Sequence, residues 1–507
     1  MRFIASEMLC SIWLGMDKSS ESGRARTPQS TGEGSPGIPS ESNELRRRLS
    51  QRQLTMLAIG GAIGVGLFLG SSVTIRLAGP GVIVTYLLGA VIALIVAYAL
   101  AEMAVVHPVA GSFGVYAHTY LSPWAGFSVR GTYALVQIIA IGAEVTAVAI
   151  YFAFWFPSIP QWVWVAGVSI CLVAVNTLQV GRFGEFEYWF ALIKVVAIIV
   201  FIVAGLGLIC GLGPAPAIGL SNLTAHGGFL PFGWKGVWLA LTLAITSYMG
   251  IEVIAVTAGE AQNPQESIPR AMRTIVFRLI LFYVLAITVM LAMTPWNQTG
   301  SGITGSPFVR ALSSVGIPYA ASIMNLVVIT AALSSSNTDL YLTTRMLFSL
   351  ARGRYAPDWL GHLSRNGVPR RALGVSTGGM IAAILLAIYA PERAFLMLYG
   401  VAVAGMFFVW IVILLTHIAF RRALGSERVA QLPMRLRFFP YSTVLGIAAL
   451  LGIAASTFYV DGLRYTVPAF APFLLLISLA YWIIRRGAGA APGIDGEGEL
   501  DPLAAEK

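Results

Sequence analysis

The chain has 507 residues, of which 57% are hydrophobic and only 11% are charged, and its mean hydropathy is +0.77. A soluble domain carries about 25% charged residues, so this composition excludes an ordinary water-soluble protein and predicts long segments that lie in lipid. The formal net charge of +10 does not indicate nucleic-acid binding, because the lysines and arginines gather between the apolar runs, where they set membrane topology.

Twelve apolar runs follow one another along the chain, each near the roughly 20 residues that a helix needs to cross a bilayer. A backbone in lipid must satisfy its own hydrogen bonds, so each run is predicted to be helical. The expected fold class is therefore an all-α integral membrane protein with about 12 transmembrane helices. The runs are 54–78, 81–106, 131–156, 161–178, 189–213, 237–258, 275–294, 319–349, 373–391, 394–420, 440–460 and 465–484.

The positions of lysine and arginine predict the orientation of these spans. If the N-terminus lies inside, each external loop carries at most one basic residue, whereas most of the 33 basic residues fall in the tails and in the loops on the other side, as the positive-inside rule requires. We therefore expect a multi-pass protein of the cytoplasmic (inner) membrane with both termini cytoplasmic. The single external basic residues are Arg76, Lys235, Arg310, Arg393 and Arg464.

The two ends of the chain differ in composition from its apolar middle. Residues 1–44 and 487–507 are predicted to be disordered cytoplasmic tails, because they are rich in small, polar and charged residues. The first 15 residues are too short and too interrupted by Glu7 for a signal peptide, and we expect translation to start at Met16. Between the tails we expect three parts: 45–213 with spans one to five, 214–420 with spans six to ten, and 421–486 with the last two.

The residues that carry enzyme or metal chemistry form no pattern in this sequence. Cys10, Cys171 and Cys210 do not indicate a disulfide framework, and the five histidines lack metal-ligand spacing. No phosphate-binding loop or nucleophile motif occurs. We expect no enzyme activity, no metal, no cofactor and no nucleic-acid partner.

The first span contains an unusual glycine-rich stretch, "AIGGAIGVGLFLG" (58–70). Glycine inside a helix costs about 0.5–1 kcal/mol relative to alanine, so five glycines need a reason. A dinucleotide fingerprint would require a preceding strand, which the cytoplasmic arginines before it do not predict. Two interpretations remain: close helix packing through GxxxG pairs, or a helix that is broken in mid-membrane, where free N–H groups suit an anion and free carbonyls suit a cation.

A second polar interruption, "TSYMG" (246–250), lies in the sixth span. Spans one and six occupy corresponding places in two sets of five spans, and because five is odd, the second set would lie upside down relative to the first. Paired interruptions in corresponding spans of such an inverted repeat are the best sequence indication of a transporter's substrate site. The second interruption therefore favours discontinuous helices one and six.

Over about residues 45–485 the chain resembles bacterial amino acid permeases of the amino acid–polyamine–organocation superfamily, in the branch of aromatic amino acid, proline, GABA and lysine permeases. The resemblance implies the fold with a 5+5 inverted repeat. Its motifs are long, ordered and spread over most of the chain. They are "LTMLAIGGAIGVGLFLGS" (54–71), "GPGVIVTYLLGAVIALIVAYALAEMAV" (79–105), "HPVAGSFGVYAHTYLSPWAGF" (107–127), "FWFPSIPQW" (154–162), "GIEVIAVTAGEAQNPQESIPRAM" (250–272), "PWNQ" (295–298) and "SPFV" (306–309).

The resemblance implies a substrate held by backbone groups between spans one and six, halfway across the membrane. The substrate carboxylate would meet N–H groups at Gly64, Val65 and Gly66. Several relatives place a hydroxyl residue where Val65 stands, so carboxylate binding here would rest on N–H groups alone. The α-ammonium would meet carbonyl groups, which the resemblance places at Ala62, Ile63, Thr246 and Met249.

Two neighbouring residues of span six complete the implied site. Gly250 would belong to the unwound segment itself. Tyr248 is either a lid over the bound substrate or an ordinary packing residue.

Three ionisable residues lie at membrane depth, where a charge is expensive and usually functional. Lys194 would take and release the coupling proton, as the resemblance implies, or it snorkels to the interface. Glu144 either faces the substrate cavity or is a protonated structural hydrogen-bonding group. Glu252 either joins helices during opening and closing or makes a plain interhelical hydrogen bond.

Weaker candidates are Glu102, near the end of span two, and Asp339 in span eight. The polar run 334–338 in span eight is expected to face the cavity or span five. In sodium-coupled relatives of this fold, groups in this region hold an ion; here the ammonium of Lys194 would replace it, which favours protons.

The expected function is a secondary active transporter that imports an L-amino acid by proton symport with alternating access. An exchanger of one amino acid for another or for its amine remains an alternative, as does a non-transporting amino acid sensor. The sequence does not resolve the side-chain pocket: a neutral substrate is the default, and a cationic, aromatic or γ-amino acid remains open. The oligomeric state is not predicted.

Overall fold

The computed structural model describes residues 64–109, 111–177, 180–212, 217–256, 263–299, 306–314, 319–364, 367–460, 463–464 and 466–487. All of them belong to one unit of the chain, Glu44–Lys507. The predicted tails 1–44 and 487–507 lie outside the described residues, except for Gly487, which ends a helix instead of belonging to the tail. Ala62 and Ile63 also lie outside the described residues.

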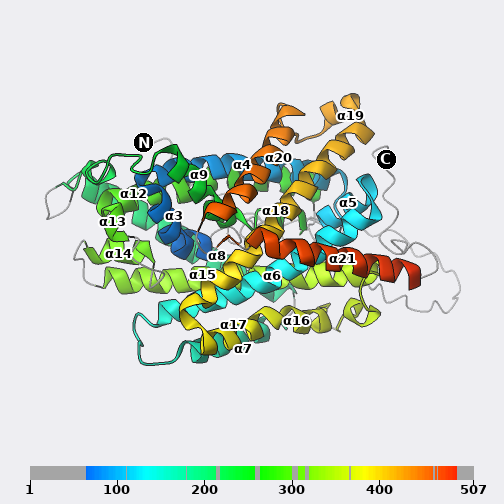
Figure 1. Cartoon of the computed structure of the whole chain (residues 1–507), viewed down its shortest axis with the longest axis horizontal. Helices are drawn as coiled ribbons and strands as arrows, with labels where there is room; N and C mark the ends of the chain where they lie inside the picture. Colours follow the sequence, from blue (N-terminus) through cyan, green and yellow to red (C-terminus); the bar gives the residue numbers. More distant parts are fainter. Residues whose placement is uncertain are drawn as a thin grey trace, which may run out of the picture. The chain divides into compact units, whose positions relative to one another are not determined.

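Helices make up the regular structure of the described residues, and they match the predicted all-α class (Figure 1). Eight helical stretches of the described residues are long and apolar enough to cross a membrane. They are Gly66–Val106, Pro123–Phe152, Glu187–Ile209, Ala320–Arg352, Arg370–Tyr389, Pro391–Leu424, Tyr441–Tyr459 and Thr466–Arg486.

The first of these stretches contains two of the predicted spans. Span one is the π-helix η1 (Gly66–Gly70) followed by α3 (Ser71–Ala78), and span two is α4 (Val82–Val106). The chain reverses between them at η2 (Gly79–Gly81), where Gly79 has a φ of +59°, a conformation that glycine adopts without strain.

Three further predicted spans are shorter or interrupted, and so fall below the length of an unbroken crossing helix. Span four is α7 (Gln161–Asn176). Span six comprises α9 (Gly233–Ala244), η4 (Ile245–Tyr248) and α10 (Val253–Val256), and span seven comprises α11 (Pro264–Arg278), η6 (Leu279–Leu285) and α12 (Ala286–Met293). Each of the twelve predicted runs therefore corresponds, at least in part, to helix.

The remaining spans are long helices joined by short ones. The spans are α6 (Pro123–Phe152), α8 (Val180–Ile209), α15 (Ala320–Arg352), α16 (Arg370–Ser376) with α17 (Gly378–Tyr389), α18 (Pro391–Leu424), α20 (Tyr441–Ser456) and α21 (Thr466–Gly487). The connecting helices are α5 (Ser112–Tyr120), η3 (Ser221–Leu223), α13 (Trp296–Thr299), α14 (Pro307–Ser314), η7 (Asp358–Gly361), α19 (Ser426–Gln431) and η8 (Thr457–Tyr459).

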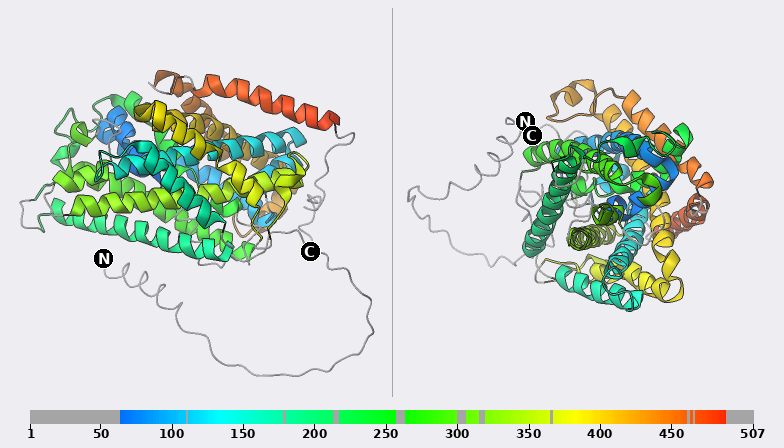
Figure 2. Two further views of the ribbon diagram at one scale, coloured as in Figure 1. Left: turned by 90° about the horizontal axis from the view of Figure 1, so that it is seen from below. Right: turned by 90° about the vertical axis from the view of Figure 1, so that its left-hand side faces the viewer.

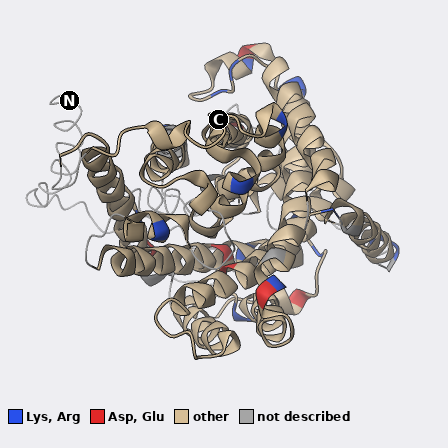
Figure 3. Ribbon diagram, turned by 60° about the vertical axis from the view of Figure 1, so that its left-hand side comes forward, with Lys and Arg blue, Asp and Glu red and all other residues tan. Residues whose placement is uncertain are grey.

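Helix α6 forms the centre of the bundle and packs most extensively against α15 and α18 (Figures 1 and 2). Peripheral helices instead turn apolar side chains outward: Val200 and Val203 on α8 and Leu475 on α21 are 59%, 63% and 71% exposed. Such faces suit contact with lipid rather than water. Charged residues are few along the helices (Figure 3).

Candidate functional site

The predicted interruption of span six is present and lies at Met249–Gly250. The 3-10 helix η4 ends at Tyr248, Met249 adopts an extended conformation with φ −55° and ψ 146°, and Gly250 has a φ of +92°. Helical structure resumes at Val253 in α10. Gly250 thus permits a sharp change of chain direction that an L side chain would strain.

At this break, backbone groups that lack helical partners form hydrogen bonds with side chains instead. Gly250 N donates to Oε2 of Glu252 at 2.7 Å, and Nε1 of Trp410 on α18 donates to Oε1 of Glu252 at 2.5 Å. The hydroxyl of Tyr283 donates to the carbonyl oxygen of Ser247 at 2.6 Å. Because non-helical backbone at membrane depth needs protein partners, these contacts explain how the interruption is tolerated.

On the opposite wall, span one presents the start of a helix. Gly64 is non-helical, and the described helix begins at Val65. The N–H groups of a helix's first turn have no carbonyl partner within that helix, which is the arrangement that suits an anion. A Cβ on Gly66 would lie 2.8 Å from Cα of Ser247. Glycine is therefore required where spans one and six approach each other.

A cavity of about 40 Å³ lies between these two segments. Spans one and six, α6, α15 and α18 all contribute to its wall. The lining residues are Gly64, Val65, Gly66, Ala140, Glu144, Thr246, Ser247, Met249, Ser335, Asp339, Tyr399 and Ala402.

The aromatic residue at this cavity is Tyr399 of α18 rather than Tyr248. The hydroxyl of Tyr399 hydrogen-bonds with Oγ1 of Thr246. Tyr248 is buried in an aromatic cluster: its ring centroid lies 4.8 Å from that of Tyr283, and its hydroxyl donates to the carbonyl oxygen of Tyr86 at 2.6 Å. Of the two interpretations of Tyr248, this placement favours packing. No local sequence signal distinguished Tyr399 from other span residues.

The predicted carboxyl group of Glu144 reaches the cavity from α6. Its Oε1 accepts a hydrogen bond from Ser335 on α15, and its Oε2 has no hydrogen-bond partner in the described part of the chain. Lys194 on α8 is fully buried, and its charge acts on Glu144. The structure therefore places these two predicted residues in one electrostatic environment.

Glu187 on α8 belongs to the same environment and was missed by sequence reasoning. It accepts hydrogen bonds from Ser334 and, at 3.3 Å, from Nδ2 of Asn337, whose Oδ1 accepts from Nδ2 of Asn176 at 2.6 Å. The charge of Lys194 acts on this carboxyl group too. The spacing of seven residues between Glu187 and Lys194 places both on one helix face and was the signal available. The polar run of span eight faces both the cavity and span five, as expected.

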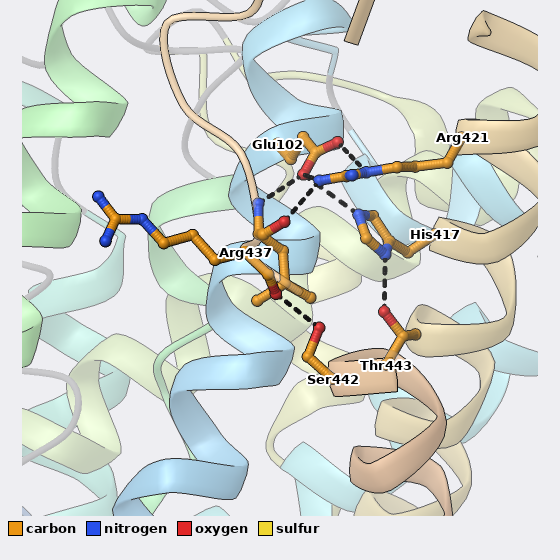
Figure 4. A network of polar contacts seen from close by, with 7 residues as sticks. Glu102, His417, Arg421, Arg437, Ser442 and Thr443 are labelled. Carbon is orange, nitrogen blue, oxygen red and sulfur yellow. Dashed lines mark hydrogen bonds and ion pairs between the residues drawn. The ribbon is translucent and has the colours of Figure 1, made fainter. Parts of the chain in front are cut away.

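A second polar cluster joins α4 to α18 and to the segment before α20 (Figure 4). The carboxylate of Glu102 accepts from Nε and Nη2 of Arg421 at 2.7 and 2.6 Å and from the backbone N of Leu436 at 2.8 Å. Nε2 of His417 lies 3.3 Å from Oε2 of Glu102, and Nδ1 of His417 lies 3.4 Å from the hydroxyl of Thr443. Glu102 is thus a paired residue that does not line the cavity.

The described residues form eight helical stretches long enough to cross a membrane and an interrupted span six beside a small polar cavity, and these features define a polytopic membrane protein. The family model for "Amino acid permease" matches residues 53–489. The "Uncharacterized amino acid permease YtnA" of Bacillus subtilis is 42% identical over 444 residues, 87% of this chain and 95% of the relative.

Two other relatives are similar over comparable lengths. The "Gamma-aminobutyric acid permease" of Bacillus subtilis is 39% identical over 87% of this chain and 94% of its own length. The "Probable threonine/serine transporter YbxG" of the same organism is 39% identical over 88% of this chain and 96% of its own length.

The chain therefore belongs to the amino acid permease family. It is a multi-pass protein of the cell membrane, and its family and relatives are transporters of amino acids rather than enzymes.

Proposed function

We propose that this permease imports an L-amino acid across the cytoplasmic membrane by proton symport, with both termini in the cytoplasm. The observation that carries the proposal is the cavity between residues 64–66 of span one and the break in span six. A buried lysine, Lys194, acts on the cavity residue Glu144. Paired helix interruptions are where transporters hold their substrates.

In this proposal the backbone holds both charged ends of the amino acid. The carboxylate binds the N–H groups of Gly64, Val65 and Gly66, at the positive end of the helix dipole. The α-ammonium binds carbonyl oxygens of Thr246 and Met249 across the cavity, together with those of span one at Ala62 and Ile63. Val65 offers no hydroxyl to the carboxylate, so glycine and backbone geometry determine this part of the affinity.

Lys194 supplies the proton coupling in this proposal. Its ammonium group is buried, and its charge acts on the carboxyl groups of Glu144 and Glu187. In this proposal, Lys194 takes up and releases the coupling proton as the contacts between spans five, three and eight change. Glu252, which joins span six to span ten, transmits opening and closing between these helices.

The size of the cavity supports a mechanism of alternating access. A volume of about 40 Å³ holds water but no amino acid, so helices must move apart before the substrate enters. A larger cavity of about 680 Å³ lies among Arg76, the end of α6 and Glu392. Ala149, which lines this larger cavity, and Glu144, which lines the small one, both lie on α6 and are separated by about 7.5 Å of helix rise. We assign this larger cavity as the outer entrance.

Uptake into proteoliposomes tests this function. The purified full-length protein is reconstituted without internal amino acid, an inward proton gradient is imposed, and uptake of each of the twenty radiolabelled amino acids is measured. Proton symport predicts accumulation of at least one amino acid that stops when the gradient is dissipated. Uptake that occurs only after preloading the vesicles with amino acid would instead establish exchange.

A further inference from the structure

The walls of the cavity are acidic. Glu144 enters from α6 and Asp339 from α15, and each side chain is only 8% exposed. Among the described lining residues none is lysine, arginine or histidine. The cavity wall therefore contains two groups that bear negative charge when ionised and offers no cationic side chain of its own.

Two buried side-chain acceptors at this place lack a hydrogen-bond donor among the described residues. Nε2 of Gln137 donates to Oδ1 of Asp339 at 3.0 Å, which fixes the orientation of both side chains. Oε1 of Gln137 and Oε2 of Glu144 are buried and have no hydrogen-bond partner among the described residues. An ionised carboxylate and an amide oxygen can only accept hydrogen bonds. A ligand that completes this site must bring N–H or O–H donors.

The charge balance indicates which donors fit. The charges of Glu144, Glu252 and Lys194 all act on Asp339. Lys194 also acts on Glu187 and Glu144, so one ammonium group is shared by several carboxyl groups. Buried charges persist only when they are paired and hydrogen-bonded. A second positive charge at the cavity would satisfy both this requirement and the unpartnered acceptors.

We propose that Asp339, held by Gln137, forms with Glu144 a subsite for a cationic substrate side chain, either a primary ammonium or a guanidinium. This inference rests on the proposed function, in which backbone groups of spans one and six hold the α-carboxylate and α-ammonium. The substrate class is then a basic L-amino acid. A neutral side chain, the default expected from the sequence, would leave Oε2 of Glu144 and Oε1 of Gln137 without donors.

The test compares basic amino acids with neutral analogues of nearly the same shape. Affinities of the purified full-length protein are measured by isothermal titration with L-lysine against L-norleucine and with L-arginine against L-citrulline. We expect at least one basic amino acid to bind 10-fold or more tightly than its neutral analogue. The Asp339→Asn variant is expected to lose at least 10-fold in affinity for that basic amino acid and little for the analogue. Asp358→Asn, at an exposed acid in η7, is the matched control and is expected to change neither affinity.

The outcomes separate this inference from the proposed function. If neutral amino acids bind as tightly as lysine and arginine, or more tightly, the cationic subsite is overturned and the amino acid site stands. If none of the twenty amino acids binds, the proposed function fails, and the subsite fails with it. Should Asp339→Asn not fold, as judged by its thermal unfolding, the comparison of analogues on the unmodified protein decides.

Discussion

Trp410 and Glu252 are joined by a hydrogen bond of 2.5 Å from the indole Nε1 to Oε1, which ties the break in span six to α18. The second oxygen of Glu252 accepts from the backbone N of Gly250 at 2.7 Å. One carboxyl group therefore both replaces a missing helical acceptor and fixes the interrupted span to a neighbouring helix. If span six moves relative to span ten, the hydrogen bond between Trp410 and Glu252 must break, or the bonded segments must move together.

Replacement of Trp410 by phenylalanine removes the indole donor and leaves Oε1 of Glu252 without this partner. We expect a loss of about 1–3 kcal/mol in the free energy of unfolding, the usual effect of an unsatisfied buried acceptor, and slower uptake. Thermal unfolding in detergent measures the first effect. Trp164→Phe is the control, because Nε1 of Trp164 has no hydrogen-bond partner in the described chain. Equal destabilisation by the two substitutions would contradict a role for the hydrogen bond.

Lys194→Ala tests proton coupling directly. We expect the variant to lose accumulation of amino acid driven by a proton gradient while it retains measurable substrate binding, because the cavity lining does not include Lys194. Uptake into proteoliposomes and binding to the purified protein are measured in parallel. Lys235→Ala, at an exposed lysine of α9, should accumulate substrate normally. Full accumulation by the Lys194 variant would remove this residue from the mechanism.

Gly66→Ala tests the close approach of spans one and six. The added Cβ would stand 2.8 Å from backbone Cα of Ser247 and 3.1 Å from the hydroxyl of Tyr399, so the two segments must separate. We expect binding to weaken by at least 10-fold, about 1.4 kcal/mol, since the N–H groups and the carbonyls would no longer face one substrate. Gly207→Ala on α8 is the control, because its Cβ would meet no atom closer than 4.0 Å. Unchanged affinity in Gly66→Ala would show that this approach does not shape the site.

The sequence predicted where the helices lie far better than which side of each helix faces the cavity. Each of the twelve predicted apolar runs coincides at least in part with helix. The polar and small residues at 246–250 correctly indicated the break in span six. A helix within a lipid-embedded bundle is apolar on most sides, so its pattern does not reveal its rotation. For this reason the sequence did not predict that Tyr399 lines the cavity, or that Gln137 donates a hydrogen bond to Asp339.

Glu187 could have been predicted, because its spacing of seven residues from Lys194 fixes a common helix face. What that face contacts depends on α15, which lies more than a hundred residues further along the chain. Partners so remote in sequence follow only from tertiary packing. The same holds for Glu102, whose partner Arg421 belongs to α18.

Glu102 and Arg421 provide the last prediction, on stability. Their two hydrogen bonds of 2.6 and 2.7 Å join α4 to α18, and the carboxylate side chain is fully buried. Removal of one partner from a buried pair leaves an uncompensated charge, which costs about 3–5 kcal/mol. Arg421→Leu should therefore lower the unfolding temperature markedly, whereas Arg422→Leu, at the exposed neighbouring position, should not.

The double variant distinguishes a charge effect from a packing effect in the same cluster. If the loss in Arg421→Leu comes from the unpaired carboxylate, then Glu102→Leu combined with Arg421→Leu should recover part of the stability, because an apolar pair leaves no buried charge. Oε2 of Glu102 also accepts from Leu436 N and lies near Nε2 of His417, so recovery should be incomplete. Thermal unfolding of the four proteins gives the coupling free energy of the pair. Strictly additive losses would mean that the ion pair contributes nothing beyond the packing of its two side chains.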